Sequence, residues 1–211
     1  MDRPGFFDHH AATWDADRHP EEDTRLARVV ALAEVQPGHA VLDVGTGTGV
    51  LVPHLLRAVG SAGRIVAIDS SPGMLEVARE KVFPSSVSFL EADVHYLPLP
   101  DADFDRVICN AALPHFEDRA QSIREMVRVL RSEGILVISH PIGRETVNRL
   151  HRDVGGPVEQ DRVPPPEAMT ALLQGAGLTE VWVADEPEFY LASGRKPGEG
   201  ESSSCGGDPT G

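Results

Sequence analysis

Short apolar runs alternate with helix-like segments along most of the chain. The runs rich in branched apolar residues predict strands at 40–44, 64–69, 86–90, 104–109 and 134–139. Apolar positions with helical spacing predict helices at 22–34, about 49–59, 72–82 and 118–131. Strands that alternate with helices in this way favour an α/β fold with a mainly parallel sheet and helices on both faces.

The pattern changes towards the end of the chain. Residues 143–152 and 167–175 have helical spacing, and two last candidate strands span 178–184 and 188–194. A short acidic and proline-containing connection separates these strands, which favours a hairpin. Gly, Ser, Pro and Glu dominate residues 195–211, so we expect a disordered tail there.

Composition narrows the class of protein. A chain of 211 residues fits one domain with a sizeable core. It carries 33 acidic residues against 19 Lys and Arg and has no basic stripe, so we do not expect it to bind nucleic acid. Cys109 and Cys205 are too few for a disulfide framework, which favours a reducing cytoplasm. No apolar stretch is long enough for a signal peptide or a membrane span. The sequence leaves the oligomeric state open.

A glycine-rich loop follows the first candidate strand and is the strongest chemical signal. Residues 41–49 read Val-Leu-Asp-Val-Gly-Thr-Gly-Thr-Gly, which predicts a strand, a tight loop and a helix start. Glycines allow positive φ and a close approach of the backbone to a ligand. Dinucleotide-binding folds have the spacing G-x-G-x-x-G, whereas these glycines are spaced G-x-G-x-G. Asp43 would repel a pyrophosphate and attract a cationic ligand.

Two further strands end in acidic residues. Asp69 closes the second candidate strand, at the place where nucleoside-binding α/β folds have an acid that accepts from two ribose hydroxyls. Ser70 and the residues after it look like the capped start of a helix. Asp93 ends the third run within Glu-Ala-Asp. Taken alone, Asp69 could be a helix-start carboxylate and Asp93 a solvated turn residue.

Together these motifs resemble the class I S-adenosylmethionine-dependent methyltransferases, in particular the ubiquinone/menaquinone biosynthesis group and its small-molecule relatives. The resemblance implies a Rossmann-like sheet of seven strands, mostly parallel, with the last strand antiparallel. It also implies S-adenosylmethionine as the cofactor and a small molecule as the methyl acceptor. The expected organisation is an N-terminal lid segment at 1–21, a methyltransferase domain at 22–194 and the tail at 195–211.

The resemblance further implies which residues bind the cofactor. They are Asp43, Gly45, Thr46, Gly47, Gly49, Asp69, Ser70, Met74, Asp93, Val94 and Asn110. On the family pattern, Asp93 meets the exocyclic amine of adenine, the N–H of Val94 meets a ring nitrogen, and Met74 packs near the base. Met74 is equally compatible with ordinary core packing.

Candidate acceptor-side residues follow the fourth and fifth strands, where α/β folds place ligands. His115 and His140 are the catalytic candidates, because an imidazole titrates near neutral pH. His115 could instead cap the next helix or pack on the cofactor. Arg144 and Asn148 share one helix face and could contact an anionic or oxygen-rich acceptor, or form only a solvated surface.

The N-terminal segment resembles the aromatic lid of the same group. Phe6 and Trp14 could exclude water and contact the sulfonium, or could only pack on the fold. No metal is expected, because the nine histidines lack ligand spacing beyond His9 and His10.

Two other classes of function remain open. A non-catalytic module that binds S-adenosylmethionine would have the same cofactor motifs. An NAD(P)-linked oxidoreductase would share the glycine loop and Asp69, but Asp43, the glycine spacing and the lack of Tyr-x-x-x-Lys disfavour it. The acceptor and its attacking atom (O, C, N or S) are also left open.

Overall fold

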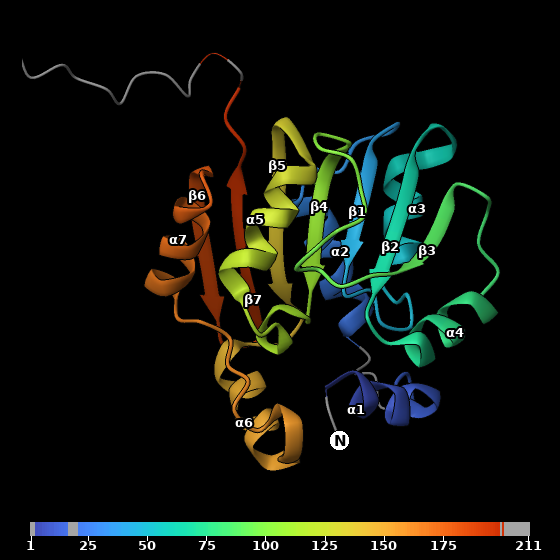
Figure 1. Ribbon diagram of the computed structural model, residues 1–211, viewed down its shortest axis with the longest axis vertical. Helices are drawn as coiled ribbons and strands as arrows, with labels where there is room; N and C mark the ends of the chain where they lie inside the picture. The colour runs from blue at the N-terminus through green and yellow to red at the C-terminus, as the bar shows by residue number, and fades with distance from the viewer. Residues whose placement is uncertain (1–2, 17–20, 199, 201–211) are drawn as a thin grey trace, which may run out of the picture.

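A seven-stranded sheet forms the centre of the computed structural model, which describes residues 3–16, 21–198 and 200 (Figure 1). The strand order is β3-β2-β1-β4-β5-β7-β6. The strands are β1 (Ala40–Val44), β2 (Arg64–Asp69), β3 (Val87–Glu91), β4 (Phe104–Asn110), β5 (Leu130–His140), β6 (Thr179–Glu186) and β7 (Phe189–Arg195). Strands β1 to β5 pair in parallel, and β7 is antiparallel to both β5 and β6. The predicted α/β fold with an antiparallel last strand is therefore confirmed.

Helices cover both faces of the sheet. The helices of the described residues are α1 (Arg3–His10), α2 (Glu22–Leu32), α3 (Val52–Val59), α4 (Pro72–Glu80), α5 (Arg119–Val129), α6 (Arg144–Val154) and α7 (Pro166–Gly175). Short 3-10 turns lie at η1 (Ala11–Thr13), η2 (Gly60–Ala62), η3 (Leu113–His115) and η4 (Gly156–Val158). Helices α2 and α3 pack with Val41 of β1 on one face, whereas α5 and α7 pack with Leu42 on the other. Neighbouring residues of a strand point to opposite faces, so β1 serves both cores.

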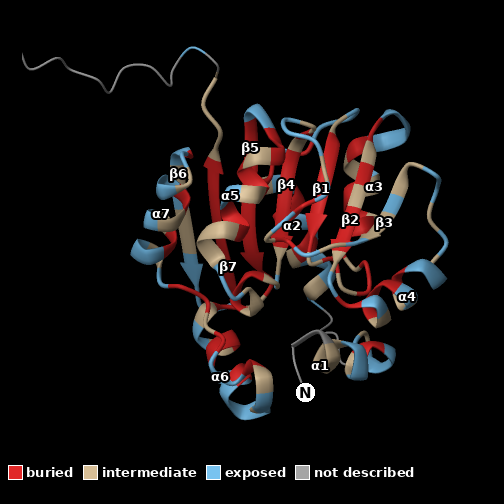
Figure 2. Cartoon of the chain, viewed as in Figure 1, coloured by how far each residue is buried: buried red, intermediate tan, exposed pale blue. Residues whose placement is uncertain are grey.

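The central strands are buried on both sides, as the red ribbons of Figure 2 show. Every residue of β1 is buried. Such strands read as continuous apolar runs rather than as alternating ones, which is why their positions could be predicted closely. The carboxyl ends of the parallel strands meet at one edge, and α1 and α6 lie beyond this edge (Figure 1).

The folded chain continues past the expected domain boundary at residue 194. Arg195 still pairs with Ile135 in the sheet. The ammonium group of Lys196 donates hydrogen bonds to the carbonyl oxygens of Val127 and Leu130, at 2.8 and 2.6 Å. Strand β7 therefore runs to Arg195, and Lys196 is held against the end of α5 and the start of β5.

Parts of the expected terminal segments lie outside the described residues. These are residues 1–2 and 17–20 of the expected lid and residues 199 and 201–211 of the expected tail. Within the described ranges, no helix combines the length and the apolar character needed to cross a membrane.

Candidate functional site

A cavity of about 740 Å³ opens at the carboxyl ends of the parallel strands. Its walls come from the ends of β1 to β4, from the loops that follow them and from the N-terminal segment. The predicted cofactor residues in its lining are Asp43, Gly45, Thr46, Gly47, Asp69, Ser70, Met74, Asp93, Val94 and Asn110. Gly49 is the predicted cofactor residue that the lining leaves out. The fold thus brings residues from four strand ends to one cavity.

The three glycines of the loop have different tasks, although all three have positive φ. The φ values are +68° at Gly45, +55° at Gly47 and +78° at Gly49. A Cβ on Gly45 would lie 2.3 Å from the Cβ of Ala112, so this position needs glycine for packing. A Cβ on Gly47 would meet no described atom within 4 Å, because this residue faces the cavity. Gly49 instead packs against helix α4 and strand β3.

Asp43 is a buried carboxyl in the floor of the cavity. Its Oδ2 accepts a hydrogen bond from the hydroxyl of Thr46, at 2.6 Å. Burial raises the pKa of Asp43 to about 7; the Thr46 hydrogen bond opposes this shift and the nearby Asp69 adds to it. A cationic group in the cavity would offset the cost of ionising this carboxyl. The site therefore suits a ligand that carries positive charge.

Asp69 connects the loop after β1 to the loop after β2. Its Oδ2 accepts from the backbone N–H of Gly47 at 2.7 Å, and its Oδ1 accepts from that of Ser71 at 2.9 Å. Burial raises the pKa of Asp69, while these backbone N–H groups lower it. An ionised carboxylate has about four acceptor sites, so both oxygens can accept further hydrogen bonds from a ligand.

The helix start after Asp69 is capped as the sequence indicates. Ser71 is the capping residue, since its hydroxyl accepts a hydrogen bond from the N–H of Met74 at 3.1 Å. Ser70 lies beside it and lines the cavity. Met74 is buried and also lines the cavity. Its side chain therefore packs in the core and is also placed to contact a ligand.

The remaining predicted cofactor residues lie at the ends of β3 and β4. Burial alone would raise the pKa of Asp93, but hydrogen bonds from the N–H and the ring of His95 hold it below its usual range. Val94 is buried in the cavity wall. The amide oxygen of Asn110 accepts from the hydroxyl of Ser139 at 2.9 Å, which ties β4 to β5.

His115 lines the other end of the cavity, at the end of η3. Its Nδ1 lies 2.7 Å from Oδ2 of Asp161, which is buried in the segment between η4 and α7. The rings of Phe7 and His151 each lie 4.9 Å from the His115 ring. Sequence analysis missed Asp161, because no local motif marks it and only a long-range contact brings it to His115.

His140 does not lie where the sequence suggested. It is buried at the end of β5, outside the cavity lining, and its Nε2 has no hydrogen-bond partner within the described part of the chain. Burial, together with smaller effects of His115 and His151, lowers its pKa to about 3. Pro141 and Ile142, which follow it, line the cavity instead. We therefore no longer assign His140 a catalytic role.

Comparison with known proteins agrees with this geometry. Residues 42–138 match the model of a protein family described as a methyltransferase domain. The ubiquinone/menaquinone biosynthesis C-methyltransferase UbiE of Saccharophagus degradans is 38% identical over 113 residues, which cover 52% of this chain and 45% of that protein. Residues 42–138 are thus similar in sequence to a methyltransferase domain. The match spans less than half the length of that relative.

Solved structures of other proteins share the fold of this chain. A methyltransferase from Haloferax volcanii, solved in complex with the Trm112 methyltransferase activator, has a TM-score of 0.73 at 22% identity. The match covers 94% of this chain and 99% of that one. A SAM-dependent methyltransferase from Aquifex aeolicus has a TM-score of 0.72 at 24% identity, covering 92% and 99%. At these identities the likeness shows a common fold.

Helix α6 does not present the predicted polar face to the cavity. Arg144 forms ion pairs with Asp185 at 2.7 Å and Glu145 at 2.9 Å. The amide oxygen of buried Asn148 accepts from the N–H of Val163 at 2.8 Å. Neither side chain belongs to the described cavity lining, and Leu150 of the same helix does. Arg144 and Asn148 therefore contact neighbouring segments of the chain rather than the cavity.

The N-terminal segment lies over the cavity, and Phe7 takes the place expected for Phe6. Phe7 and Trp14 line the cavity, with their rings 5.7 Å apart. Phe6 packs on Phe7 and on the ring of His10, outside the described lining.

Two carboxylates attach this segment to the cofactor loops. Asp8 accepts from the hydroxyl of Ser71 at 2.6 Å and from the N–H of Gly73 at 2.9 Å. Asp15 accepts from the hydroxyl of Thr48 at 2.6 Å and from Lys81 at 2.7 Å. The described part of the segment is therefore held by the loop that follows β1 and by helix α4 with the residues that flank it.

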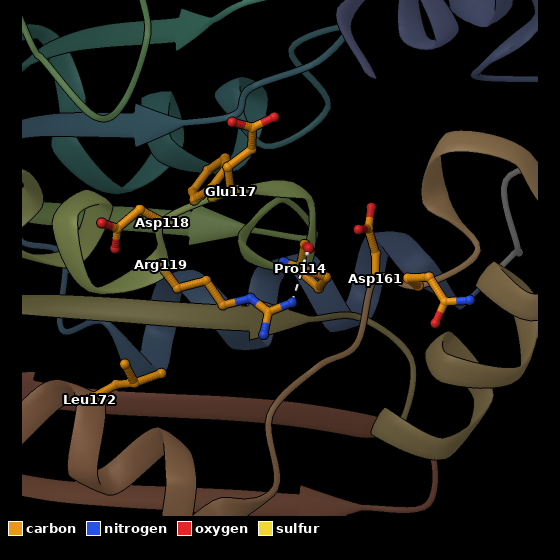
Figure 3. A pocket seen from close by; sticks show the side chains of 8 residues that line it. Pro114, Glu117, Asp118, Arg119, Asp161 and Leu172 are labelled. Atoms are coloured by element: carbon orange, nitrogen blue, oxygen red, sulfur yellow. Dashed lines mark hydrogen bonds between the residues drawn. The ribbon is translucent and has the colours of Figure 1, made fainter. Parts of the chain in front are cut away.

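A smaller and more open hollow of about 590 Å³ includes Pro114 of η3 in its lining (Figure 3). It is lined by Pro114, Phe116, Glu117, Asp118, Arg119, Gln160, Asp161 and Leu172. Arg119 donates to the carbonyl oxygen of Pro114 within it, at 3.2 Å. None of the predicted cofactor residues lines this hollow as described, so we assign the ligand site to the larger cavity.

Proposed function

We propose that the whole chain transfers a methyl group from S-adenosylmethionine to a small-molecule acceptor. The observation that carries this proposal is the convergence of acidic residues from successive strand ends on one cavity. Asp43, Asp69 and Asp93 all line it, together with the backbone of Gly47. A cationic nucleoside such as S-adenosylmethionine has hydroxyl groups, an amine and a positive charge, and each of these can interact with a carboxylate.

Each carboxylate would take a different part of the cofactor. The free acceptor sites of Asp69 suit the two ribose hydroxyls, and Asp93 suits the exocyclic amine of adenine. Asp43 would supply negative charge towards the cationic end. The bound cofactor would supply a methyl group already activated by positive sulfur. The protein would then orient the acceptor and exclude water.

The acceptor would occupy the end of the cavity near His115. Sites for small molecules commonly have volumes of roughly 300–1,000 Å³, and this cavity of about 740 Å³ lies within that range. Phe7, Trp14, Phe116 and Leu150 give this end an apolar wall. The acidic composition disfavours nucleic acid as the acceptor. We therefore propose an acceptor with an apolar body and one reactive polar group.

The test is transfer of an isotopically marked methyl group. The protein is incubated with S-adenosylmethionine that carries a deuterated methyl and with fractions of a small-molecule extract from its source organism. Mass spectrometry then searches for a compound that gains one labelled methyl group. The Asp69→Ala variant is the matched control, since it keeps the acceptor end and weakens the cofactor end.

Two results would overturn the proposal in different ways. Cofactor binding without methylation of any fraction would favour a non-catalytic module that binds S-adenosylmethionine. Absence of both binding and methylation would remove the cofactor assignment itself.

A further inference from the structure

A carboxylate from a distant part of the chain lies directly behind His115. The Nδ1 atom of His115 and the Oδ2 atom of Asp161 are 2.7 Å apart. His115 lines the large cavity, whereas Asp161 lines the neighbouring smaller hollow, in which Figure 3 labels it. Only 2% of the Asp161 side chain is exposed, against 14% of His115. The imidazole therefore lies between the buried carboxylate and the cavity.

This arrangement decides which ring nitrogen carries the hydrogen. An ionised carboxylate can only accept hydrogen bonds, so an ionised Asp161 requires the Nδ1 of His115 to be the donor. A neutral imidazole has one N–H group, and Nε2 then keeps its lone pair. Nε2 is thus the basic atom of a side chain that lines the cavity.

The rings that contact His115 are uncharged near pH 7, so Asp161 is the charged group in contact with this imidazole. His151 of α6 contacts the ring, and its Nδ1 lies 3.0 Å from the main-chain oxygen of Asp161. Burial lowers the pKa of His151, and that of His140 on β5 falls to about 3. Both rings are therefore neutral near pH 7. Phe7 of α1 presents an apolar ring, and Glu117 lines the cavity farther along the loop.

We propose that Asp161 is a positioning residue that fixes the tautomer of His115, and that Nε2 of His115 takes a proton from the acceptor during methyl transfer. This inference rests on the proposed function. It narrows the acceptor class to small molecules whose attacking atom arrives with a proton, such as those with a weakly acidic hydroxyl group. An acceptor without such a proton would need no base.

The proton and the electrons balance in this step. The O–H bond of the acceptor breaks, its proton passes to Nε2, and a lone pair of the same oxygen bonds to the methyl carbon. The bond between that carbon and sulfur breaks, and its electron pair stays on sulfur. The products are a methyl ether, a neutral thioether and an imidazolium, which afterwards releases its proton to water.

The direct test is nitrogen NMR of the histidine side chains in the full chain, without cofactor or acceptor. The signals of His115 are identified by their loss in His115→Gln. We expect Nδ1 of His115 to carry the hydrogen in the wild-type protein. Asp161→Asn should abolish this preference, because an amide can also donate to Nδ1. The matched control Asp185→Asn removes a carboxylate that pairs with Arg144 outside the cavity and should leave the spectrum unchanged.

The wild-type spectrum shows which ring nitrogen of His115 carries the hydrogen, even if Asp161→Asn does not fold. A hydrogen on Nε2 of His115 in the wild-type protein would overturn the proposal. Because this readout involves no methyl transfer, its failure is distinct from failure of the proposed function. That function stands if methylation occurs while His115 has the other tautomer.

Kinetics with a hydroxyl acceptor then test whether Asp161 positions His115 or only maintains the structure of the site. Asp161→Asn should lower kcat by about 10²-fold or more and leave the KM for the acceptor within about twofold. The loss should shrink with acceptors whose hydroxyl is already ionised at the assay pH. His115→Gln should cause a similar loss, and the double variant should lose little more, because the pair acts as a unit. Independent losses that multiply, or a rise in KM alone, would contradict the proposal.

Discussion

The two ends of the cavity obtain their carboxylates in different ways. At the cofactor end, Asp43 and Asp69 lie on strands β1 and β2, and residues two or three positions away supply a hydrogen bond to each of them. At the acceptor end, His115 depends on Asp161, which lies 46 residues farther along the chain. The cofactor end is therefore built from local motifs, and the acceptor end from tertiary packing.

Because of this difference, we expect the acceptor end to vary more than the cofactor end among proteins with this fold. A local motif keeps its geometry as long as the strand and the loop form, so it can hold one cofactor in many proteins. A contact between distant loops can be replaced when either loop changes. We therefore expect changes at the cofactor end to alter affinity and changes at the acceptor end to alter turnover.

The largest effect should come from His115→Gln. Loss of a general base lowers the rate by about 10²–10⁴-fold, so turnover should fall within this range. The affinity for S-adenosylmethionine should stay within about twofold, since His115 lies away from the predicted cofactor contacts. Steady-state kinetics and calorimetry measure the two quantities. His39→Gln, before β1 at the opposite edge of the sheet, is the control; full turnover in His115→Gln would remove the histidine from the mechanism.

The reverse pattern should appear in Asp69→Ala. Hydrogen bonds to a charged group contribute about 1.5–3 kcal/mol, so the cofactor should bind with a dissociation constant about 10- to 150-fold higher. Turnover at saturating cofactor should change less. The N–H groups of Gly47 and Ser71 also lose their acceptor, so the thermal stability of the variant must be measured beside its affinity. Early melting with normal affinity would make Asp69 a purely structural residue.

Asp43→Asn should stabilise the cofactor-free protein at high pH. Burial raises the pKa of Asp43 from 3.8 to about 7, so the unfolded state loses its proton at a lower pH than the folded state. The stability from the neutral carboxyl is therefore lost as pH rises from 3.8 to about 7. The melting temperature of Asp43→Asn should exceed that of the wild type increasingly over this window, by about 2–4 °C for each kcal/mol.

Cofactor binding gives the complementary half of that test. The variant should bind S-adenosylmethionine more weakly than the wild type at pH 8, where Asp43 is ionised. An equal melting temperature at every pH would contradict the assignment of Asp43 as a destabilised carboxyl.

The smallest effect should follow Arg144→Ala. This guanidinium pairs with Asp185 and Glu145 outside the described cavity lining. Such ion pairs usually contribute about 0–1 kcal/mol, so the free energy of unfolding should fall by no more than this. Turnover should stay within about twofold of the wild type. A large rise in the KM for the acceptor would restore Arg144 to the acceptor site.

The fold could be predicted closely because its signals are local. Each parallel strand is an apolar run between turn residues, and most boundaries differ from the prediction by one to three residues. Strand β5 is longer than predicted, starting at Leu130 directly after α5. The residues predicted to bind the cofactor, apart from Gly49, line one cavity, because the loop glycines and the acids at strand ends are placed by the same local geometry.

The acceptor end could not be predicted in this way. A place after a strand fixes the backbone of a residue but not the direction of its side chain. His140 therefore turned out to be buried outside the cavity lining, and Asn148 holds the backbone of Val163. Successive helical residues point about 100° apart, so Phe7 rather than Phe6 faces the cavity. Asp161 has no local signal, since its role arises only through its contact with His115.

Calorimetric titration of the wild-type protein tests the central claim most directly, which is that the acidic strand ends bind a cationic nucleoside. Three ligands are compared under the same conditions: S-adenosylmethionine, its demethylated product S-adenosylhomocysteine, and NAD. We predict saturable binding of both sulfur ligands and none of NAD, because Asp43 lies where a pyrophosphate would be repelled. Tight binding of NAD with no heat from either sulfur ligand would contradict the account.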